Sequence, residues 1–557
     1  MARIKLIFFL FLGLFIVIWL RLFYWQIVSS ESLKRKAESQ YYFRLEIPAI
    51  RGRILSVDGS PFVTNRPAYM VFAEKNKVEN YNDFISKIGP LIGESEASIS
   101  AKLSSSNLWV PLKNKVEESS VKNLRALKLS GIGFEREDQR YYPEASMAAH
   151  LLGFVGKDTL GKDKGYFGLE GKYDSELSGQ NGYLQQEKDA FGNPIIIGES
   201  ERIDAENGRS ILLYTDKAIQ FIAEEKLKEG LKKYKAKSGN VIIVDPSTGG
   251  ILALASYPSY DPSHFIDFPK EYFKNPVIGD SYEPGSTFKV LIMASAIDGG
   301  VVKTDENFEE TGPVKVSDYT IKTWDNKYHG KISMTQILEY SSNVGMVYIA
   351  QKMGKEKLLR AISDFGFERA TNVDLEDEQA PEMREKNQWR DIDLATASFG
   401  QGIAVTPLQM AMAVSVLANN GYLMQPVMVK KIITDNGKII DLKPKEVKRV
   451  IKSQTAKIIT EMMVSAVENG EAKWAKPKGY RIAGKTGTAQ IPVEGHYDQD
   501  KTIASFVGFA PADKPRFVML VTLREPETSP WGSETAAPLF FEIAKELFSY
   551  FGIPPSS

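Results

Sequence analysis

The chain has 557 residues, of which 43% are hydrophobic and 25% charged, and its 70 Lys and Arg residues balance its 70 Asp and Glu residues. At roughly 100 to 200 residues per domain we expect about two to four folded domains, and the neutral balance excludes the electrostatic footprint of a nucleic-acid-binding protein. With no cysteine and four dispersed histidines, the chain has no disulfide, no thiol nucleophile and no metal-ligand spacing, so we expect neither a metal nor a cofactor.

An unbroken apolar run covers residues 6–20, follows Arg3 and Lys5, and continues in character past Arg21. A membrane span needs about 20 residues, which the run reaches if Arg21 extends its charge toward a headgroup. We therefore predict one membrane helix. A cleaved signal peptide is the alternative because the uninterrupted run is short, although no small-x-small site follows it. Lys34 to Lys36 lie on the other flank, so the charge rule is nearly balanced for orientation.

Residues from about 29 to 204 alternate short apolar runs with polar turns, which predicts a mixed α/β module. Asp58-Gly59 indicates a tight turn, and the run from Arg140 to Pro143 ends an extended segment. By composition these are ordinary structural residues, and an Arg beside a Gly, as at Arg51 to Arg53, is usually a turn with a solvated charge.

A second module begins near Ser210. Apolar residues recur at helical spacing over 218–231. The apolar runs 241–244 and 251–254 flank a connection rich in turn formers, which predicts a hairpin.

The next feature is Ser286, which follows Pro284 and Gly285 and precedes an apolar run over 288–293. Pro and Gly end the preceding loop, so we predict a buried helix that starts at or just before Ser286. Residues three apart share a helix face, and the Lys289 amine can therefore lie over the Ser286 hydroxyl. A hydroxyl needs a base to become a nucleophile, and a lysine is a base only when burial or another cation suppresses its charge.

Two later motifs supply further polar groups. Ser341 and Asn343 suit a short loop or helix start, where Ser341 could relay a proton and Asn343 could hold a substrate amide. Lys485 is the candidate second cation, because two ammonium groups in one cleft make each other harder to protonate.

Lys485-Thr486-Gly487-Thr488 reads as a strand, and we expect an edge strand. Gly487 would let a substrate lie close, the hydroxyls of Thr486 and Thr488 could bind a carboxylate, and an unpaired backbone N–H could stabilise an oxyanion. The helix start at Ser286 offers the second N–H.

Three motifs thus occur in order: a Ser with a Lys three residues later, a Ser-x-Asn element and a Lys-Thr-Gly strand. This order is typical of serine acyl transfer. Two other segments fit one motif each, but neither has the order or the turn-then-helix context: Ser119 to Lys122 and Ser105 to Asn107. Strands over 482–490, 503–509 and 517–523 and a closing amphipathic helix over 536–551 complete the module. Strands at both ends with a helical middle predict an α+β fold, an antiparallel sheet packed against helices.

With these motifs the chain resembles the class B penicillin-binding proteins, the monofunctional peptidoglycan D,D-transpeptidases, over nearly its whole length. The transpeptidase-domain motifs are Glu283-Pro284-Gly285-Ser286-Thr287, Ser398-Phe399-Gly400-Gln401-Gly402, Thr406-Pro407-Leu408-Gln409 and Lys485-Thr486-Gly487-Thr488-Ala489. The pedestal motifs are Arg51-Gly52-x-Ile54, Arg140-x-Tyr142-Pro143, His150-Leu151-Leu152-Gly153 and Gly168-Leu169-Glu170. Ser56-Val57 stands where the family usually has Asp-Arg, which puts a pedestal ion pair in question.

The resemblance implies a role for each site residue. Ser286 would attack the D-Ala-D-Ala bond of a stem peptide with Lys289 as general base, and Ser341 with Lys485 would pass the proton to the leaving D-Ala. Asn343 would orient the donor peptide. Thr486 and Thr488 would bind its carboxylate beside Gly487, and the backbone N–H groups of Ser286 and Thr488 would form the oxyanion hole. An amine acceptor would then complete the cross-link, and β-lactams would trap Ser286.

The resemblance also implies an organisation. Residues 1–28 would be a short cytoplasmic tail and a single transmembrane helix, 29–205 a dimerisation-type pedestal, and 206–557 the transpeptidase domain, outside the cytoplasm of a bacterial plasma membrane. The motif contexts at 282–286 and 341–345 are closer to the division, FtsI-like branch than to the elongation branch. The family's partner would be a SEDS-family membrane glycosyltransferase, with other division proteins.

Three other classes of function stay open. A serine β-lactamase shares the motifs, but would be a much smaller secreted chain with a deacylating Glu. A penicillin-sensing receptor would have more membrane helices. A division scaffold without turnover would need no working Ser286.

Overall fold

The computed structural model describes residues 2–105, 107–189, 195, 200–493 and 496–555. These divide into two compact units, one made of Met1–Arg51 with Ser178–Gly208 and the other of Gly52–Leu177 with Arg209–Ser557. The second unit contains all the motif residues that the sequence singles out for chemistry.

The first unit begins with the apolar run. Its residues form α1 (Ala2–Phe23), which continues as a π-helical turn η1 (Tyr24–Val28) and is followed by α2 (Ser30–Tyr41). The stretch Ala2–Val28 is 27 residues long with mean hydropathy 2.7, long and apolar enough to cross a membrane, as predicted. The unit also contains an antiparallel sheet of β1 (Tyr42–Ile47), β8 (Gly182–Glu187) and β9 (Ser200–Ile203).

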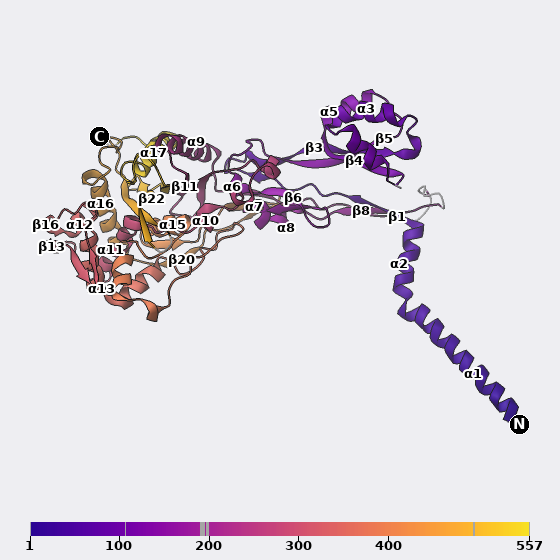
Figure 1. The fold of residues 1–557 in the computed structure, drawn as a ribbon, viewed down its shortest axis with the longest axis horizontal. Helices are drawn as coiled ribbons and strands as arrows, with labels where there is room; N and C mark the ends of the chain where they lie inside the picture. Colours follow the sequence, from indigo (N-terminus) through magenta and orange to yellow (C-terminus); the bar gives the residue numbers. More distant parts are fainter. Residues whose placement is uncertain (1, 106, 190–194, 196–199, 494–495, 556–557) are drawn as a thin grey trace. The chain divides into compact units, whose positions relative to one another are not determined.

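The second unit opens with most of the predicted mixed α/β module, whose ends, up to Arg51 and from Ser178, belong to the first unit (Figure 1). Gly59, with φ +86°, closes the predicted turn between the first two strands, and Tyr141 ends the predicted extended segment. Asn80 caps one helix by accepting from the N–H groups of Asn82 and Asp83. The elements are β2 (Ile54–Leu55), β3 (Pro61–Glu74), α3 (Tyr81–Ile92), α4 (Glu96–Leu103), β4 (Trp109–Glu117), α5 (Glu118–Ala126) and β5 (Ile132–Tyr141).

The two motif look-alikes lie in this module, away from the later motifs in sequence. Ser119 to Lys122 belong to α5, as part of an ordinary amphipathic helix. Ser105 to Asn107 includes Ser106, which is outside the described residues.

A set of short elements joins this module to the C-terminal one. Phe154 stacks on Phe265, with ring centroids 4.0 Å apart, inside a cluster of aromatic side chains. The elements are α6 (Ala149–Leu152), β6 (Phe154–Lys157), β7 (Asp163–Tyr166), α7 (Gly168–Lys172), α8 (Asp174–Ser178) and η3 (Pro262–Asp267). One sheet continues across both modules in the order β19-β18-β10-β2-β3-β4, through β10 (Ser210–Leu213), β18 (Val429–Ile433) and β19 (Ile439–Asp441).

The pedestal motifs form a buried ion pair. Arg140 Nε lies 2.6 Å from Glu170 Oε1, and the two side chains are 6% and 0% exposed. Arg140 also donates to the carbonyl of Gly52 at 2.6 Å. At the position where the family pattern differs, the Ser56 hydroxyl donates to the Thr215 carbonyl. The uncharged Ser56 and Val57 form no ion pair at that position, and the buried pair of Arg140 and Glu170 is a separate one.

The C-terminal module is built on a five-stranded antiparallel sheet of order β12-β11-β23-β22-β21. The predicted hairpin and the three predicted late strands are confirmed. Both faces are apolar, because Val241 and Ile243 face one core while Ile242 and Val244 face another. The strands are β11 (Ser238–Val244), β12 (Ile251–Tyr257), β21 (Ala483–Val493), β22 (His496–Ala510) and β23 (Phe517–Arg524).

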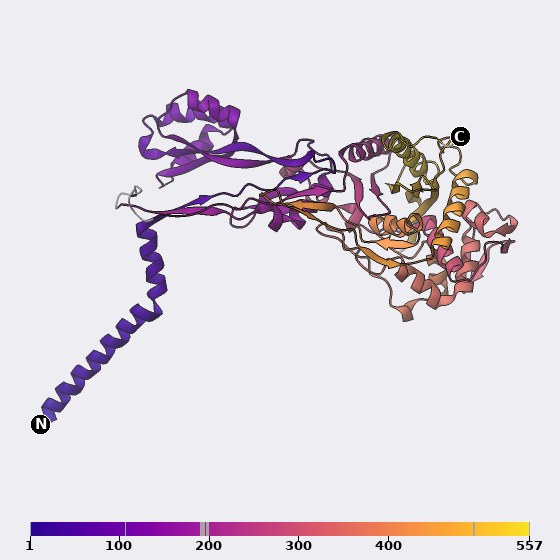
Figure 2. The ribbon, with the colours of Figure 1, turned by 180° about the vertical axis from the view of Figure 1, so that it is seen from behind.

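Helices cover both faces of this sheet. The predicted helices α9 (Lys217–Tyr234) and α17 (Ala536–Tyr550) lie side by side and share one core with the strands (Figures 1 and 2). The helical middle of the chain shares the other core. It comprises α10 (Pro276–Gly279), η5 (Gly285–Phe288), α11 (Lys289–Asp298), α12 (Met334–Glu339), α13 (Asn343–Asp364), α14 (Asp391–Ala397), α15 (Pro407–Ala418) and α16 (Ser453–Asn469). The predicted α+β fold, helices packed against an antiparallel sheet, is confirmed.

The helical middle also contains three short antiparallel strand pairs in its described residues. These are β13 (Asn307–Glu310) with β16 (Gly330–Ser333), β14 (Val314–Val316) with β15 (Tyr319–Ile321), and β17 (Tyr422–Met424) with β20 (Glu446–Arg449).

Candidate active site

Ser286 lies in the first turn of a buried helix, as predicted. This turn, η5, is a 3-10 helix, and the α-helix α11 begins at Lys289. Gly285 adopts φ +56°, and its N–H donates to the Gly400 carbonyl at 2.9 Å. A side chain at Gly285 would be strained by this φ and would also lie 3.0 Å from the Thr488 carbonyl. The glycine therefore lets the turn of Ser286 approach strand β21.

Lys289 is fully buried. Its Nζ donates to the Ser341 carbonyl, lies 3.2 Å from Ser341 Oγ and lies 2.8 Å from Asn343 Oδ1. These contacts occupy the three donors of an ammonium group. The sequence places this amine over Ser286, but in the described part of the chain none of its hydrogen bonds goes to Ser286. The helical spacing decides on which face of the helix Lys289 lies, and the contacts with the Ser341 loop decide where its amine points.

Lys485, on strand β21, also reaches the Ser341 hydroxyl. It is 3% exposed, and its Nζ lies 3.0 Å from Ser341 Oγ and 3.1 Å from Thr486 Oγ1. The Ser341 hydroxyl thus stands between two lysine amines that are far apart in sequence. The predicted convergence of the three motifs is observed.

Burial dominates the electrostatics of both amines. It lowers the pKa of Lys289 well below its usual 10.5, and the charge of Lys485 lowers it further, whereas Glu471 and Glu310 act in the opposite direction. Burial also lowers the pKa of Lys485, again opposed by Glu471. The second cation that the sequence suggests does contribute, but loss of water around Lys289 is the larger cause.

The Ser341 to Asn343 element is a loop that turns into a helix start, as predicted. Ser341 adopts a left-handed φ of 53°, and Ser342 caps α13 by accepting from the Gly345 N–H at 2.8 Å. Asn343 begins the helix, and its Nδ2 donates to the Lys322 carbonyl at 3.1 Å. Since its Oδ1 accepts from Lys289, both ends of this amide have protein partners.

Strand β21 is an edge strand of the described sheet, as predicted. Thr486, Thr488 and Gln490 alternate along it and line a pocket. Thr488 Oγ1 accepts from the Gly532 N–H at 2.9 Å. A side chain on Gly487 would lie 2.4 Å from Ser505 Oγ and 2.8 Å from Thr287 Cγ2. The first consequence of this glycine is therefore close packing of the strand on the nucleophile turn.

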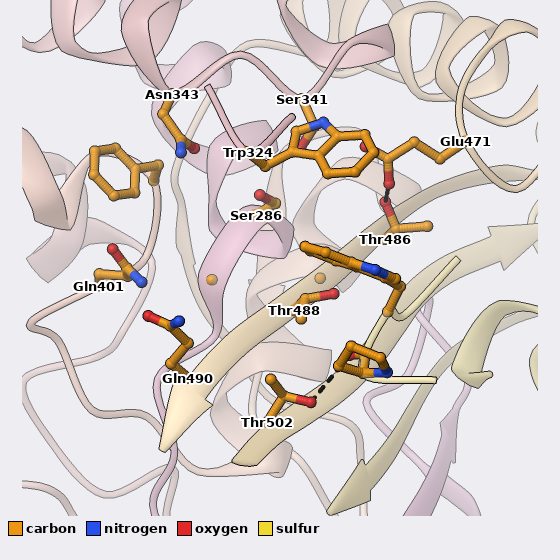
Figure 3. Close-up of a pocket in the computed structure, with 15 residues that line it drawn as sticks. Ser286, Trp324, Ser341, Asn343, Gln401, Glu471, Thr486, Thr488, Gln490 and Thr502 are labelled. Carbon is orange, nitrogen blue, oxygen red and sulfur yellow. Dashed lines mark hydrogen bonds between the residues drawn. The ribbon is translucent and has the colours of Figure 1, made fainter. Parts of the chain in front are cut away.

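The pocket is a cavity of about 320 Å³, and Ser286 points into it between Trp324 and Thr488 (Figure 3). Trp324 and Trp531 meet edge to face with ring centroids 5.1 Å apart. Phe399 and Gln401 belong to a motif that carries the family resemblance. Neither they nor the remaining residues that line the pocket were predicted as site residues. These are Trp324, Phe399, Gln401, Glu471, Gln490, Thr502, Pro530 and Trp531. Their positions are set by contacts that local patterns do not reveal.

Comparison with known proteins identifies the two parts of the chain. Residues 239–545 match the penicillin-binding protein transpeptidase domain, and residues 46–213 match the penicillin-binding protein dimerisation domain. The first match alone spans more than half of the chain.

Relatives match over nearly full length. Stage V sporulation protein D of Bacillus subtilis is 32% identical, covering 100% of this chain and 87% of the relative. Peptidoglycan D,D-transpeptidase FtsI of Escherichia coli K12 is 30% identical, covering 96% of this chain and 89% of FtsI.

Solved structures share the fold. A peptidoglycan synthetase from Bifidobacterium adolescentis aligns with a TM-score of 0.76 and 27% identity, over 93% of this chain and 98% of that one. Penicillin-binding protein 3 of Mycobacterium tuberculosis, complexed with aztreonam, aligns with a TM-score of 0.72 and 26% identity, over 92% and 98%. With a serine, two buried lysines and an edge strand around one pocket, this chain belongs to the class B penicillin-binding proteins and is a transpeptidase.

Proposed function

We propose that this chain is a peptidoglycan D,D-transpeptidase that cross-links stem peptides through an acyl-enzyme on Ser286, in septal wall synthesis during division. One observation carries the proposal. Ser341 Oγ lies 3.2 Å from Lys289 Nζ and 3.0 Å from Lys485 Nζ, beside the pocket that Ser286 lines. This arrangement offers a base, a relay and a second amine at one place.

Lys289 acts as the general base. When it is neutral, its amine has two N–H donors and one lone pair. The Ser341 carbonyl and Asn343 Oδ1 only accept, so the Ser341 hydroxyl donates to the lone pair. The amine then takes the Ser286 proton as Ser286 Oγ attacks the carbonyl carbon of the D-Ala-D-Ala bond, once its lone pair turns from Ser341 Oγ to Ser286.

The other residues act on the developing charges. The backbone N–H groups of Ser286 and Thr488 stabilise the oxyanion, and the hydroxyls of Thr486 and Thr488 bind the terminal carboxylate of the donor. The proton then passes from Lys289 through Ser341, with Lys485 beside it, to the amine of the leaving D-Ala. An acceptor amine attacks the acyl-enzyme, forms the new amide and regenerates Ser286. Asn343 holds Lys289 and offers its amide edge to the donor peptide.

Mass spectrometry of the full-length protein after treatment with penicillin tests this chemistry. We expect a single covalent adduct on Ser286, because the strained lactam takes the place of the D-Ala-D-Ala bond. The adduct is absent in Ser286→Ala and forms very slowly in Lys289→Ala. Labelling at another residue refutes the assignment.

Two further measurements separate the competing classes. Rapid turnover of the penicillin adduct would support a serine β-lactamase. Normal cell division in a strain that contains only the Ser286→Ala variant would support a scaffold. We expect neither result, because the chain matches a peptidoglycan D,D-transpeptidase over nearly its full length and the proposed reaction depends on Ser286.

The setting in the cell is proposed from the relatives. The proteins named FtsI support a role in division, and the similar identity to a sporulation protein supports spore wall synthesis as a second candidate. Depletion of the protein separates them and the elongation alternative. Filaments without septa indicate division, a defect confined to spores indicates sporulation, and rounding of cells indicates elongation.

The proposed topology places the N-terminal end of α1, with Arg3 and Lys5, at the cytoplasmic side and the catalytic module outside the cytoplasm. Residues 1–28 anchor the chain, 29–205 form the pedestal, and 206–557 carry the chemistry. The anchor and pedestal offer a SEDS-family glycosyltransferase its contact surface, which copurification with a chain lacking residues 1–28 tests. Because the sequence has no cysteine, Lys303→Cys introduces a single exposed thiol. An impermeant maleimide applied to spheroplasts or protoplasts labels it only if this module lies outside.

A further inference from the structure

Glu310 is a fully buried carboxylate at the end of strand β13. One of its oxygens, Oε1, accepts a short hydrogen bond from the Ser342 hydroxyl. The other, Oε2, accepts from the backbone N–H of His329 at 3.1 Å and contacts the Nδ1 of its ring at 3.0 Å. A carboxylate removed from water is tolerated when such partners surround it, so these contacts hold it in one place.

Ser342 is the residue through which Glu310 reaches the active site. Its hydroxyl donates to Glu310 and also accepts from the Gly345 N–H, in the first turn of α13. Ser341, immediately before it, adopts φ 53°, a left-handed conformation that is unfavourable for a non-glycine residue unless its surroundings impose it. Asn343, immediately after it, opens the helix. The carboxylate thus binds Ser342, and the residues on either side of Ser342 bind Lys289.

The surroundings of Glu310 also connect it to the pocket rim. The His329 ring stacks on Tyr340 with centroids 4.1 Å apart, and the Tyr340 carbonyl accepts from Trp324 Nε1 at 3.4 Å. His329 is the ionisable partner that contacts Glu310 in the described part of the chain, and its side chain is one-third exposed. The negative charge of Glu310 opposes the loss of the Lys289 proton, together with Glu471 and against Lys485.

We propose that Glu310 is a positioning residue for acyl transfer: its buried carboxylate holds Ser342, and through Ser342 it keeps the left-handed Ser341 and the start of α13 aligned on the Lys289 amine. The inference rests on the proposed function of Ser286. It adds a residue that touches neither the substrate nor the reacting atoms.

The test compares Glu310→Gln with Glu309→Gln, its exposed neighbour, in the detergent-solubilised full-length protein. The measurement is the second-order rate constant of acylation by a fluorescent penicillin, followed across pH, with a melting curve for each variant. Glu310→Gln slows acylation by about 10- to 100-fold, because a small displacement of the base is enough. It also moves the acid limb of the pH–rate profile to lower pH, because the negative charge of Glu310, which favours the protonated Lys289 amine, is gone. Glu309→Gln changes neither.

Two more variants separate position from charge. Ser342→Ala removes the contact but keeps the carboxylate, so it slows acylation without moving the acid limb. Glu310→Asp keeps the charge with a shorter side chain and restores the acid limb with a partly restored rate. If Glu310→Gln gives no cooperative melting transition, Ser342→Ala decides the question.

Wild-type acylation rates in Glu310→Gln and Ser342→Ala overturn the inference. A wild-type protein that is not acylated on Ser286 at all contradicts the proposed function instead, so the two failures are distinguishable.

Discussion

The pedestal and the catalytic pocket bury cations in opposite ways. In the pedestal, Arg140 meets a carboxylate, Glu170, at 2.6 Å, and both side chains are almost inaccessible. Beside the pocket, Lys289 and Lys485 are also buried, but they converge on a neutral hydroxyl, that of Ser341, which lines the pocket. A buried cation with an anionic partner stays charged and becomes part of the structure, whereas a buried amine without one tends to lose its proton. We therefore expect the first arrangement to serve stability and the second to serve reactivity.

The largest effect is expected at Lys289, where a substitution should change reactivity much more than stability. Lys289→Met removes the proposed base and slows acylation by penicillin by about 10²- to 10⁴-fold. Its loss of stability is smaller than that of the pedestal variant below, because the substitution also removes a buried amine. Stopped-flow acylation and thermal unfolding measure both quantities. Lys303→Met, at an exposed lysine, is the matched control and leaves both unchanged. A fully active Lys289→Met would remove the distinction between the two regions.

The pedestal variant should show the reverse pattern. Glu170→Gln leaves the buried charge of Arg140 without its anion, and we expect the free energy of unfolding to fall by about 3–5 kcal/mol. The acylation rate of the folded protein stays at the wild-type value because this pair lies outside the pocket lining. Denaturant titration with an acylation assay checks both. A large loss of acylation without a loss of stability is the contrary result.

The dependence on pH sharpens the comparison. The folded pKa of Lys289 lies below its usual 10.5, so between these two values the unfolded chain binds a proton that the folded chain does not. The free energy of unfolding of the wild-type protein, minus that of Lys289→Met, therefore rises with pH across this window. The difference levels off above about pH 10.5. Acylation falls as pH drops through the lowered pKa. Calorimetry of both proteins across pH tests the sign, and a difference that falls with rising pH contradicts it.

The smallest effect belongs to an exposed ion pair. Lys233 and Glu542 lie 2.9 Å apart with side chains 55% and 43% exposed. Glu542→Gln should change the free energy of unfolding by less than about 1 kcal/mol, and added salt should reduce the difference further. Melting curves at low and high salt measure this. An effect as large as that of Glu170→Gln would mean that burial is not what distinguishes the pedestal pair.

Local patterns in the sequence predict much of the fold and the chemistry. Apolar spacing and turn formers locate the membrane-length helix, the hairpin of β11 and β12, the late strands and the helix that Ser286 opens. The period of a helix places Lys289 on the side of Ser286, and residue type and turn signals predict that Lys485 to Thr488 lie in a strand. These features depend on neighbours a few residues away, so a single sequence contains them.

The contacts that complete the site could not be predicted in this way. Lys289 and Ser341 are 52 residues apart, and Lys485 and Ser341 are 144 apart. Neither the buried Glu310 nor the paired Trp324 and Trp531 belongs to a recognisable motif. Similarly, the sequence places Gly487 on the strand, but only the packing shows that it lines the pocket and lies against Ser505 and Thr287.

The sequence by itself determined which elements the chain forms and predicted which residues carry the proposed chemistry, because spacing and residue type are local properties. The tertiary structure alone decided where each amine points, how far it is removed from water and which buried carboxylate steadies the loop between the two lysines. Those properties arise when distant segments pack together, and burial then sets the charge state on which the reaction depends.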